Sequence, residues 1–240
     1  MTDLTLVAFN AHAGVHGRRR LAGQRFDLAG ALRAFDADVI VIPEAYRPDR
    51  GPDPIAETAA TIGELYEFVL GRERLDPWPH LVRRGPGTGH RSLAVITRLP
   101  TRRVGDLSVG RVVGDPARAR AALHLELDVD GRPLQLVAVH LTSRLPHGPP
   151  IQLSRLRRLL PEPPPPAVVA GDFNFWGPPV RALLPGWRRA VVGRTWPARR
   201  PHSQIDHVLV RGGVTAVSGE VLPDVGSDHR PVRVRLRLSS

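Results

Sequence analysis

Polar residues that could bind a metal ion and a phosphate group follow the predicted buried strands of this sequence. The clearest example is Ala-Val-Val-Ala-Gly-Asp-Phe-Asn at residues 167–174, where a short apolar strand ends at Gly171. Side chains alternate along an extended chain, so Asp172 and Asn174 are expected on one side and Phe173 on the other. A carboxylate and a carboxamide held together in this way can orient a metal ion, a water molecule and a phosphoryl oxygen.

Asparagine occurs only at Asn10 and Asn174, and each follows a predicted buried strand. Because asparagine is a poor strand former, this placement indicates a chemical role. Other strand ends carry polar residues in the same way. These residues are Glu44, His140, Asp172, Asp206, Asp228 and His229. The ends of adjacent strands meet at one edge of a sheet, so we expect these eight residues to form one active site.

Length and composition indicate one globular domain over residues 1–240. The chain has 240 residues, of which 42% are hydrophobic and 24% are charged, and these values fit a globular fold. No apolar run approaches the ~20 residues that a membrane helix needs, and the amino terminus lacks a secretory pattern. We therefore expect a soluble, cytoplasmic protein. Cysteine is absent, which excludes disulfides and thiolate chemistry.

The positive charge comes entirely from arginine. The formal net charge is +11, and all 34 residues counted as lysine or arginine are arginine. A biased codon pool would produce this composition, and so would a surface that binds phosphates, because the guanidinium fork matches phosphate oxygens. Both explanations stay open. The run Arg18, Arg19 and Arg20 predicts a mobile basic loop.

Strands dominate the elements expected to position these residues. Apolar or alternating segments predict strands at residues 4–9, 38–43, 66–70, 92–97, 205–210 and 214–221 and after His229. A hairpin is predicted over 121–139, with its turn at Asp130 and Gly131. Helices are predicted from Asp27, over 54–65 and over 151–160. Residues 71–89 predict a long surface loop. The segments 11–25, 71–90, 101–118 and 142–150 are loop candidates for substrate contact, and none carries a readable code for the substrate.

Six motifs resemble, in the right order, those of the endonuclease/exonuclease/phosphatase superfamily, which includes DNase I, exonuclease III-type apurinic endonucleases, neutral sphingomyelinases and inositol polyphosphate 5-phosphatases. The motifs are F-N at 9–10, P-E at 43–44, V-H-L at 139–141, G-D-F-N at 171–174, I-D-H at 205–207 and G-S-D-H-R-P-V at 226–232. The resemblance covers residues 4–238. It implies an α+β fold, a four-layer α/β/β/α sandwich of two packed mixed β-sheets flanked by helices.

The resemblance also implies a metal site. Glu44 resembles the metal-binding glutamate of the family, Asn10 the asparagine beside it, and Asp228 an aspartate that completes the site. Mg²⁺ prefers oxygen ligands, keeps several waters and needs only one or two carboxylates besides the substrate, so a sparse oxygen site suits it. We therefore expect Mg²⁺ as the cofactor, with Mn²⁺ as a substitute.

Catalytic roles follow from the same resemblance. His229 resembles the catalytic histidine, and Asp206 resembles the carboxylate that orients it and raises its basicity. Asp172 would orient or deprotonate the attacking water, and Asn174 would hydrogen-bond a phosphoryl oxygen. Whether Asp172 or His229 is the general base stays open.

A second histidine, His140, resembles one that acts on the leaving or a non-bridging oxygen in the DNase I and sphingomyelinase branches. In the DNase I branch a glutamate orients that histidine, but the corresponding residues 90–92 contain no acid. What orients His140 is therefore open. Arg120 resembles a phosphate-binding arginine, with Arg118 as the alternative.

The predicted reaction is Mg²⁺-dependent hydrolysis of a phosphodiester by in-line attack of water. The basic charge favours a polyanionic substrate, DNA or RNA, over a phospholipid. A phospholipid, sphingomyelin or phosphoinositide phosphoesterase is the enzymatic alternative, for which Trp176 or residues 77–79 would form a lipid-facing patch. A catalytically inactive binding module is the second alternative, and it predicts gaps among the motif residues, of which the core set has none. No protein partner is predicted.

Overall fold

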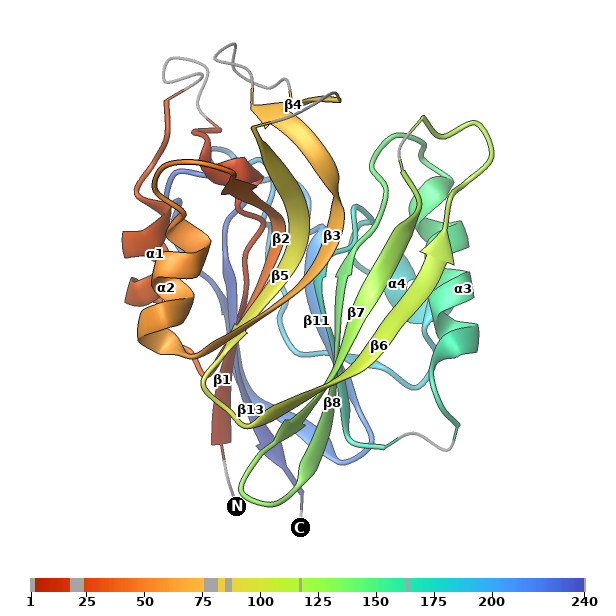
Figure 1. Ribbon diagram of the computed structural model, residues 1–240. Helices are drawn as coiled ribbons and strands as arrows, with labels where there is room; N and C mark the ends of the chain where they lie inside the picture. Colours follow the sequence, from red (N-terminus) through yellow and green to blue (C-terminus); the bar gives the residue numbers. More distant parts are fainter. Residues whose placement is uncertain are drawn as a thin grey trace.

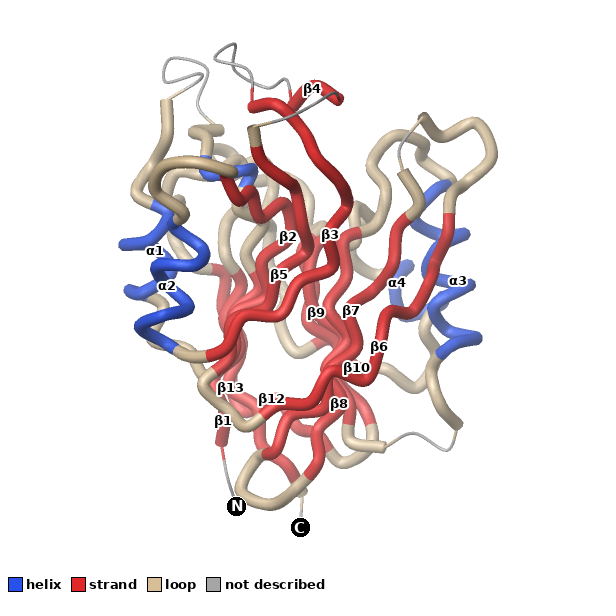
Figure 2. The backbone as a smooth tube through the Cα atoms, viewed as in Figure 1, coloured by secondary structure: helices blue, strands red, loops and turns tan. Residues whose placement is uncertain are grey.

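Two β-sheets packed face to face form the centre of the molecule (Figure 1). The computed structural model describes residues 3–17, 24–75, 82–84, 88–116, 118–162 and 165–239. One sheet has seven strands in the order β12-β13-β1-β2-β5-β3-β4, and the other has six in the order β10-β11-β9-β8-β7-β6. Figure 2 shows α1 and α2 on one outer side of the sheets and α3 and α4 on the other. The predicted four-layer α/β/β/α sandwich is confirmed.

The strands and helices have the following bounds. The seven-stranded sheet consists of β1 (Asp3–Ala8), β2 (Val39–Pro48), β3 (Glu64–Leu75), β4 (Val82–Arg84), β5 (Gly89–Thr97), β12 (Val214–Val221) and β13 (Val232–Leu238). The six-stranded sheet consists of β6 (Thr101–Gly110), β7 (Arg120–Asp128), β8 (Pro133–His140), β9 (Ala167–Asp172), β10 (Arg188–Arg189) and β11 (Asp206–Arg211). The helices are η1 (His12–Gly14), α1 (Leu28–Ala34), α2 (Pro54–Ile62), α3 (Gly148–Leu159) and α4 (Pro179–Leu183).

Three apolar clusters hold the four layers together. The largest lies between the two sheets and takes alternate residues of their strands, such as Leu6 of β1 and Leu123 of β7. A second cluster joins α1 and α2 to the seven-stranded sheet and includes Val7 and Ile40. The third joins α3 and α4 to the six-stranded sheet. Strands such as β1 are therefore buried on both faces, which is why their sequences are continuous apolar runs.

Two local sequence signals, a helix cap and a hairpin turn, lie where the sequence predicts them. Asp27 caps α1, because its carboxylate accepts a hydrogen bond from the backbone N–H of Gly30 at 2.8 Å. The β7–β8 hairpin turns at Asp130 and Gly131, which have φ values of 53° and 79°. Positive φ at both central residues is the requirement of a type I′ turn, and Asp-Gly meets it well.

Gly171 allows β8 and β9 to approach closely near the end of both strands. Its φ is 136°, and a Cβ at this position would lie 2.1 Å from the carbonyl oxygen of Val139. Only glycine fits there without displacing backbone. The glycine of the G-D-F-N motif therefore fixes the position of Asp172 beside His140, its register partner on the parallel strand β8.

Two segments predicted as loops contain strands instead. Residues 71–89 hold the end of β3, all of β4 and the first residue of β5, and residues 101–110 form β6. β4 and β6 lie at the edges of their sheets, and half of the residues of β6 are exposed. β6 lies at a sheet edge and buries only Val109 fully, so its sequence pattern does not reveal a strand.

Some expectations concern residues that the structure does not describe. The arginine run 18–20 and the segment 77–79 lie outside the described residues. Within the described part of the chain, no helix is long and apolar enough to cross a membrane.

Candidate active site

Three neighbouring strands of the six-stranded sheet place polar residues side by side. Asp172, the last residue of β9, pairs in register with His140 on one side and with Asp206 on the other. From the other sheet, Asn10 follows β1, and its side-chain amide donates a hydrogen bond to Asp172 Oδ2 at 2.9 Å. This hydrogen bond brings together predicted residues of the two sheets, one following β1 and the other ending β9.

Glu44 lies within β2 rather than beyond its end. The pairing of β2 with β5 shifts between Ile42 and Ala45, and Glu44 has a φ of 53° at this bulge. Positive φ is uncommon for a residue other than glycine, and bulges often re-aim a side chain near a site. Here the Glu44 carboxylate lies 3.6 Å from His140 Nε2.

The two asparagines hold the Asp172 carboxylate. Asn174 donates from its backbone N–H to Asp172 Oδ1 at 2.8 Å, and its side-chain amide donates to Asp172 Oδ2 at 3.2 Å and to the Leu141 carbonyl at 2.9 Å. A bond from Asn174 to a phosphoryl oxygen would therefore replace one of these. Asn10 donates to Asp172, and its Oδ1 accepts from the backbone N–H of His12 at 2.9 Å.

Burial raises the pKa of Asp172 to about 7, and the neighbouring carboxylate of Asp206 adds to this rise. The positive charge of His229 and the hydrogen bonds from Asn174 and Asn10 oppose the rise. The result is a carboxyl group that changes its protonation state near neutral pH. A group with such a pKa is suited to proton transfer.

His229 forms a buried ion pair with Asp206. Its Nδ1 donates to Asp206 Oδ2 at 2.9 Å, while its Nε2 lies 4.0 Å from Asp172 Oδ2. Burial lowers the pKa of His229, but the charges of Asp206 and Asp172 outweigh burial and raise it to about 10. The imidazole is therefore a cation at neutral pH.

Two hydroxyl groups, which sequence reasoning missed, hold this pair in place. Ser227 donates to the Asn10 carbonyl at 2.7 Å and accepts from the His229 backbone N–H at 3.2 Å. Thr195 accepts from the backbone N–H of Asp206 at 3.3 Å. Ser227 belongs to the S-D-H motif and could have been proposed from it, whereas Thr195 has no sequence signal.

Arg120 orients His140. Its Nη1 lies 3.1 Å from His140 Nδ1, and because a guanidinium group has no acceptor, Nδ1 must accept and the proton lies on Nε2. Burial, together with the charge of Arg120, holds the pKa of His140 well below its usual value. Arg118, the alternative to Arg120, is exposed and donates instead to the Leu70 carbonyl at 3.3 Å.

Arg91 is a further residue of the site that was not predicted. Its Nη1 lies 3.5 Å from Glu44 Oε2, and its Nε lies 3.3 Å from Glu73 Oε2. Burial raises the pKa of Glu44, but the positive charges around it, that of Arg91 above all, lower it more, so the net shift is downward. Glu44 is therefore a permanent anion at neutral pH. From the sequence, this stretch was notable only because residues 90–92 contain no acid, and that observation gave no role to Arg91.

The predicted metal ligands fit a hard divalent cation. Glu44 offers a carboxylate that no hydrogen bond occupies among the described residues, Asp228 is partly exposed, and Asn10 Oδ1 keeps a free lone pair. Oxygen ligands of this kind suit Mg²⁺ or Mn²⁺. A second set, Asp172, Asp206 and His229, has ligand atoms within 4.8 Å of one another. In that set the protonated imidazole already supplies the positive charge.

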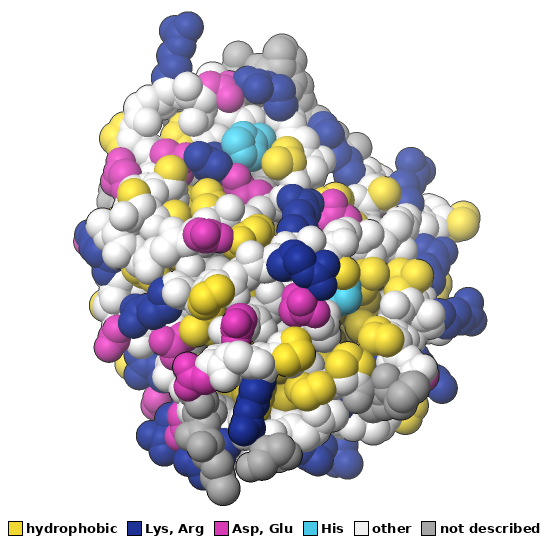
Figure 3. Space-filling view, turned by 60° about the horizontal axis from the view of Figure 1, so that its bottom comes forward, with side chains coloured by type: hydrophobic (Ala, Val, Ile, Leu, Met, Phe, Trp, Pro, Cys, Tyr) yellow, Lys and Arg dark blue, Asp and Glu magenta, His cyan; other side chains and the backbone are white. Residues whose placement is uncertain are grey.

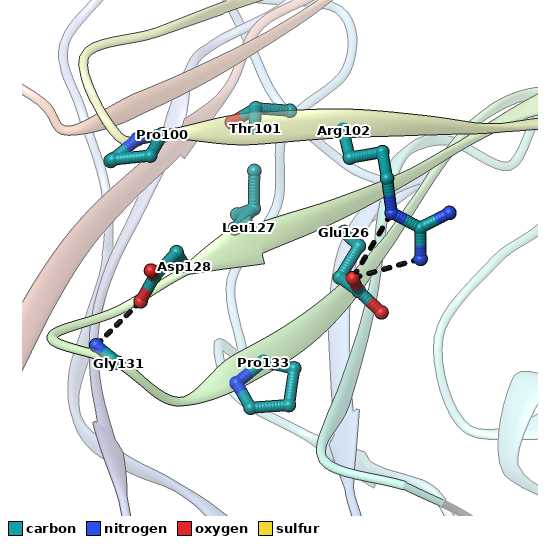
Figure 4. A pocket seen from close by; sticks show the side chains of 8 residues that line it. All are labelled: Pro100, Thr101, Arg102, Glu126, Leu127, Asp128, Gly131 and Pro133. Atoms are coloured by element: carbon teal, nitrogen blue, oxygen red, sulfur yellow. Dashed lines mark hydrogen bonds and ion pairs between the residues drawn. The ribbon is translucent and has the colours of Figure 1, made fainter.

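A pocket of about 340 Å³ lies away from these residues (Figure 4). Its lining residues are Pro100, Thr101, Arg102, Glu126, Leu127, Asp128, Gly131 and Pro133. Figure 3, with the lower end of Figure 1 turned forward, shows arginine and acidic side chains interspersed over that face. Arg102 pairs with Glu126 at 2.9 Å, and the pocket contains none of the predicted site residues.

Solved structures with the same fold come from several organisms. An endonuclease/exonuclease/phosphatase from Beutenbergia cavernae is 22% identical, with a TM-score of 0.75, and the match covers 100% of this chain and 72% of that one. The mannosyl-6-phosphatase Bt3783 from Bacteroides thetaiotaomicron is 17% identical, with a TM-score of 0.68 and coverage of 98% and 100%. Truncated TDP2 from Caenorhabditis elegans is 14% identical, with a TM-score of 0.64 and coverage of 99% and 98%.

Sequence comparison assigns the family. A search of curated proteins found no match. The family model described as "Endonuclease/Exonuclease/phosphatase family" matches residues 7–229, which include every residue of the predicted site. The chain therefore belongs to the endonuclease/exonuclease/phosphatase family, whose members are phosphoester hydrolases.

Proposed function

We propose that this protein is a Mg²⁺-dependent phosphodiesterase that cleaves DNA or RNA by in-line attack of water, with Mn²⁺ as a substitute. The observation that carries the proposal is the contact chain Glu44–His140–Asp172–His229–Asp206, in which neighbouring side chains lie 2.9–4.0 Å apart. These contacts join residues from both sheets. They bring together a carboxylate that suits a metal ion, a carboxyl group that can accept a proton, and two histidines.

Asp172 is the proposed general base. Its pKa of about 7 lies near the pH of reaction, whereas His229 is already protonated and cannot accept a proton. The water oxygen attacks phosphorus, a water proton passes to Asp172, and the bond from phosphorus to the leaving oxygen breaks as that oxygen takes up a proton from solvent. The imidazolium of His229 stabilises the negative charge that develops, and Asp206 holds its ring in place.

His140 is a hydrogen-bond donor in this proposal rather than a general acid. Its neutral imidazole presents Nε2–H toward Glu44 and Asp172, at 3.6 and 3.8 Å, so it can donate to a non-bridging oxygen of the substrate. Glu44, Asn10 and Asp228 would hold the metal ion. When bound, the ion supplies Lewis-acid polarisation of a phosphoryl oxygen.

Nucleic acid is the proposed substrate because the net charge is +11 and a polyanion gains from electrostatic attraction to such a chain. Trp176, two residues beyond Asn174, is 62% exposed and could stack on a base. The same indole could enter a lipid headgroup layer, so a phospholipid or sphingomyelin substrate is the second candidate. The salt dependence of KM separates them, because binding of nucleic acid weakens steeply with salt.

The experiment measures hydrolysis of plasmid DNA, single-stranded DNA and RNA, and sphingomyelin vesicles, each with Mg²⁺, Mn²⁺ or EDTA. The test variants are Asp172→Asn, His229→Gln and Glu44→Gln. The control is Asp106→Asn, which changes an exposed carboxylate paired with Arg103 outside the site. We expect loss of activity in the first two variants, a higher Mg²⁺ requirement in Glu44→Gln, and wild-type behaviour of the control.

Three results would contradict the proposal. Cleavage that persists in Asp172→Asn or in EDTA would point to a contaminant. An unchanged Mg²⁺ requirement in Glu44→Gln would remove Glu44 from the metal site. Failure of the wild type to hydrolyse any substrate with several divalent ions would favour a binding module.

A further inference from the structure

His207 is a buried histidine next to Asp206 on β11. Along this strand Val208 lies in the core between the sheets, and Leu209 lies in the cluster that joins α3 and α4 to the six-stranded sheet. Because side chains alternate along a strand, Asp206 is directed between the sheets and His207 toward the helices. The exposed fraction of His207 is 0%, so its side chain cannot contact a substrate.

The His207 side chain holds the backbone of the segment that follows β9. Its Nε2 lies 2.9 Å from the carbonyl oxygen of Phe175, and because a carbonyl oxygen only accepts, Nε2 carries the proton and donates. Burial lowers the pKa of His207 to about 4, so the ring is neutral at pH 7 and this N–H is its single donor. The ring also packs edge to face against Phe173, with the centroids 5.1 Å apart.

Residues 173–177 form a turn that is fixed at three alternate residues. Two of the contacts are backbone hydrogen bonds, from Phe173 to the carbonyl of Ile205 at 2.9 Å and from Gly177 to the carbonyl of Gln204 at 3.2 Å. The third contact lies between them and is the bond from the imidazole N–H to the turn. It is the one contact of the three that comes from a side chain, so a substitution can remove it.

Asn174 lies at the centre of this turn in an uncommon backbone conformation. Its φ is 47°, and residues other than glycine keep such a conformation only where their surroundings hold them in it. In that conformation its backbone N–H donates to Asp172 Oδ1 at 2.8 Å, and its side-chain amide donates to Asp172 Oδ2 at 3.2 Å. Release of the turn at Phe175 would let Asn174 return to a negative φ and withdraw these donors from Asp172.

A histidine at position 207 carries a cost in stability. Its Nδ1 is buried and has no hydrogen-bond partner among the described residues, and a buried acceptor without a partner costs free energy. Leu209, which points toward the same helices, is apolar, and an apolar side chain in place of His207 would avoid that cost. The N–H that reaches Phe175 is therefore the property for which a histidine is suited here.

We propose that His207 is a positioning residue, which keeps Asn174 against Asp172 by holding the carbonyl of Phe175. This inference rests on the proposed function, in which Asp172 is the general base. The turn orients the base, whereas the metal site and the basic charge of the protein still bind the substrate when the turn is released. The N–H donor at position 207 therefore affects kcat strongly and KM weakly.

The experiment removes either the donor or the ring. His207→Phe keeps a ring against Phe173 without a donor, His207→Met is a second donor-free variant whose flexible side chain adapts to the core, and His207→Gln keeps an N–H donor without the ring. The control is His124→Phe, since His124 is buried on β7 outside the site and its Nε2 lies 2.7 Å from Gln135 Oε1. Each protein is assayed with Mg²⁺ for kcat and KM on whichever DNA, RNA or sphingomyelin substrate the wild type hydrolyses fastest. The midpoint of urea unfolding and the amide hydrogen exchange of residues 173–177 are measured on the same proteins.

We expect His207→Phe and His207→Met to lower kcat at least tenfold with a change in KM below threefold, and to make amide exchange in the turn at least tenfold faster. His207→Gln should keep kcat within threefold of the wild type, and His124→Phe should lower the urea midpoint but not kcat. A kcat within threefold of the wild type in the donor-free variants would overturn the proposal. A loss in His207→Gln equal to that in His207→Phe would also overturn it.

Amide exchange separates this inference from the proposed function. If the wild type hydrolyses no substrate, the proposed function fails, but faster exchange in His207→Phe and not in His207→Gln would still show that the donor holds the turn. Unchanged exchange in the donor-free variants would overturn the inference even in an active enzyme. His207→Met decides if His207→Phe does not fold, and failure of both to fold would make His207 a structural residue and overturn the proposal.

Discussion

Replacing Asp206 with asparagine tests the electrostatics of the site through stability. The buried carboxylate of Asp206 contacts His229 Nδ1 at 2.9 and 3.1 Å. It is the largest of the influences that raise the pKa of His229 to about 10, against the effect of burial. Asparagine keeps the shape but not the charge. Without that charge, the pKa of His229 should fall, because burial is then opposed only by Asp172 and other weaker influences.

The free energy of unfolding should show a defined pH dependence. Below pH 6.5, His229 is protonated in both the folded and the unfolded chain, and its stabilising contribution is fully present. Between pH 6.5 and about 10 only the folded protein holds this proton, so the contribution is lost as the pH rises. The rise of the His229 pKa from 6.5 to about 10 corresponds to on the order of 5 kcal/mol in the free energy of unfolding.

Urea unfolding of the wild type and Asp206→Asn at pH 6.5, 8 and 9.5 measures this contribution. Removing one partner of a buried ion pair costs about 3–5 kcal/mol, so we expect a loss of that size at pH 6.5 that shrinks severalfold by pH 9.5. Asp115→Asn is the control, since Asp115 is equally buried but accepts a hydrogen bond from the Thr142 hydroxyl. A loss in Asp206→Asn that is the same at all three pH values would refute the reasoning.

Three further substitutions test the scaffold, each by urea unfolding. Gly171→Ala would place a Cβ 2.1 Å from the Val139 carbonyl at a φ of 136°, so we expect a loss of more than about 3 kcal/mol; a loss below 1 kcal/mol would contradict the close approach. Leu123→Ala, in the core between the sheets, should cost about 3–4 kcal/mol, and a smaller cost would mean that this core collapses around the cavity. Asp27→Ala removes the cap of α1 and should cost about 1 kcal/mol, whereas an unchanged stability would show that the cap is dispensable.

Much of the fold could be predicted because most strands are buried on both faces or alternate regularly. β12 has the predicted bounds, and the hairpin turn at Asp130 and Gly131 is where the sequence places it. β4 and β6 could not be predicted, since they lie at sheet edges. Alternation depends on one face meeting the core, and half of the residues of the edge strand β6 are exposed.

The residues of the site could be named from strand ends, but their neighbours could not. Alternation along β9 places Asp172 at a strand end, yet it does not say that β8 and β11 are the strands beside it. That order sets His140 and Asp206 on either side of Asp172. The bulge at Glu44 could not be predicted either, because the residue types around Glu44 do not indicate a positive φ there.

The absence of an acid at residues 90–92 has a physical consequence that the sequence alone could not reveal. Arg91 occupies that stretch and borders Glu44, while His140 accepts its orienting hydrogen bond from Arg120. A carboxylate beside Nδ1 would favour a protonated imidazole, but a guanidinium group there favours a neutral one. In the proposed function, arginines in place of the acid therefore make His140 a hydrogen-bond donor instead of a proton donor. It also places positive charge beside the carboxylate of Glu44 and the imidazole of His140.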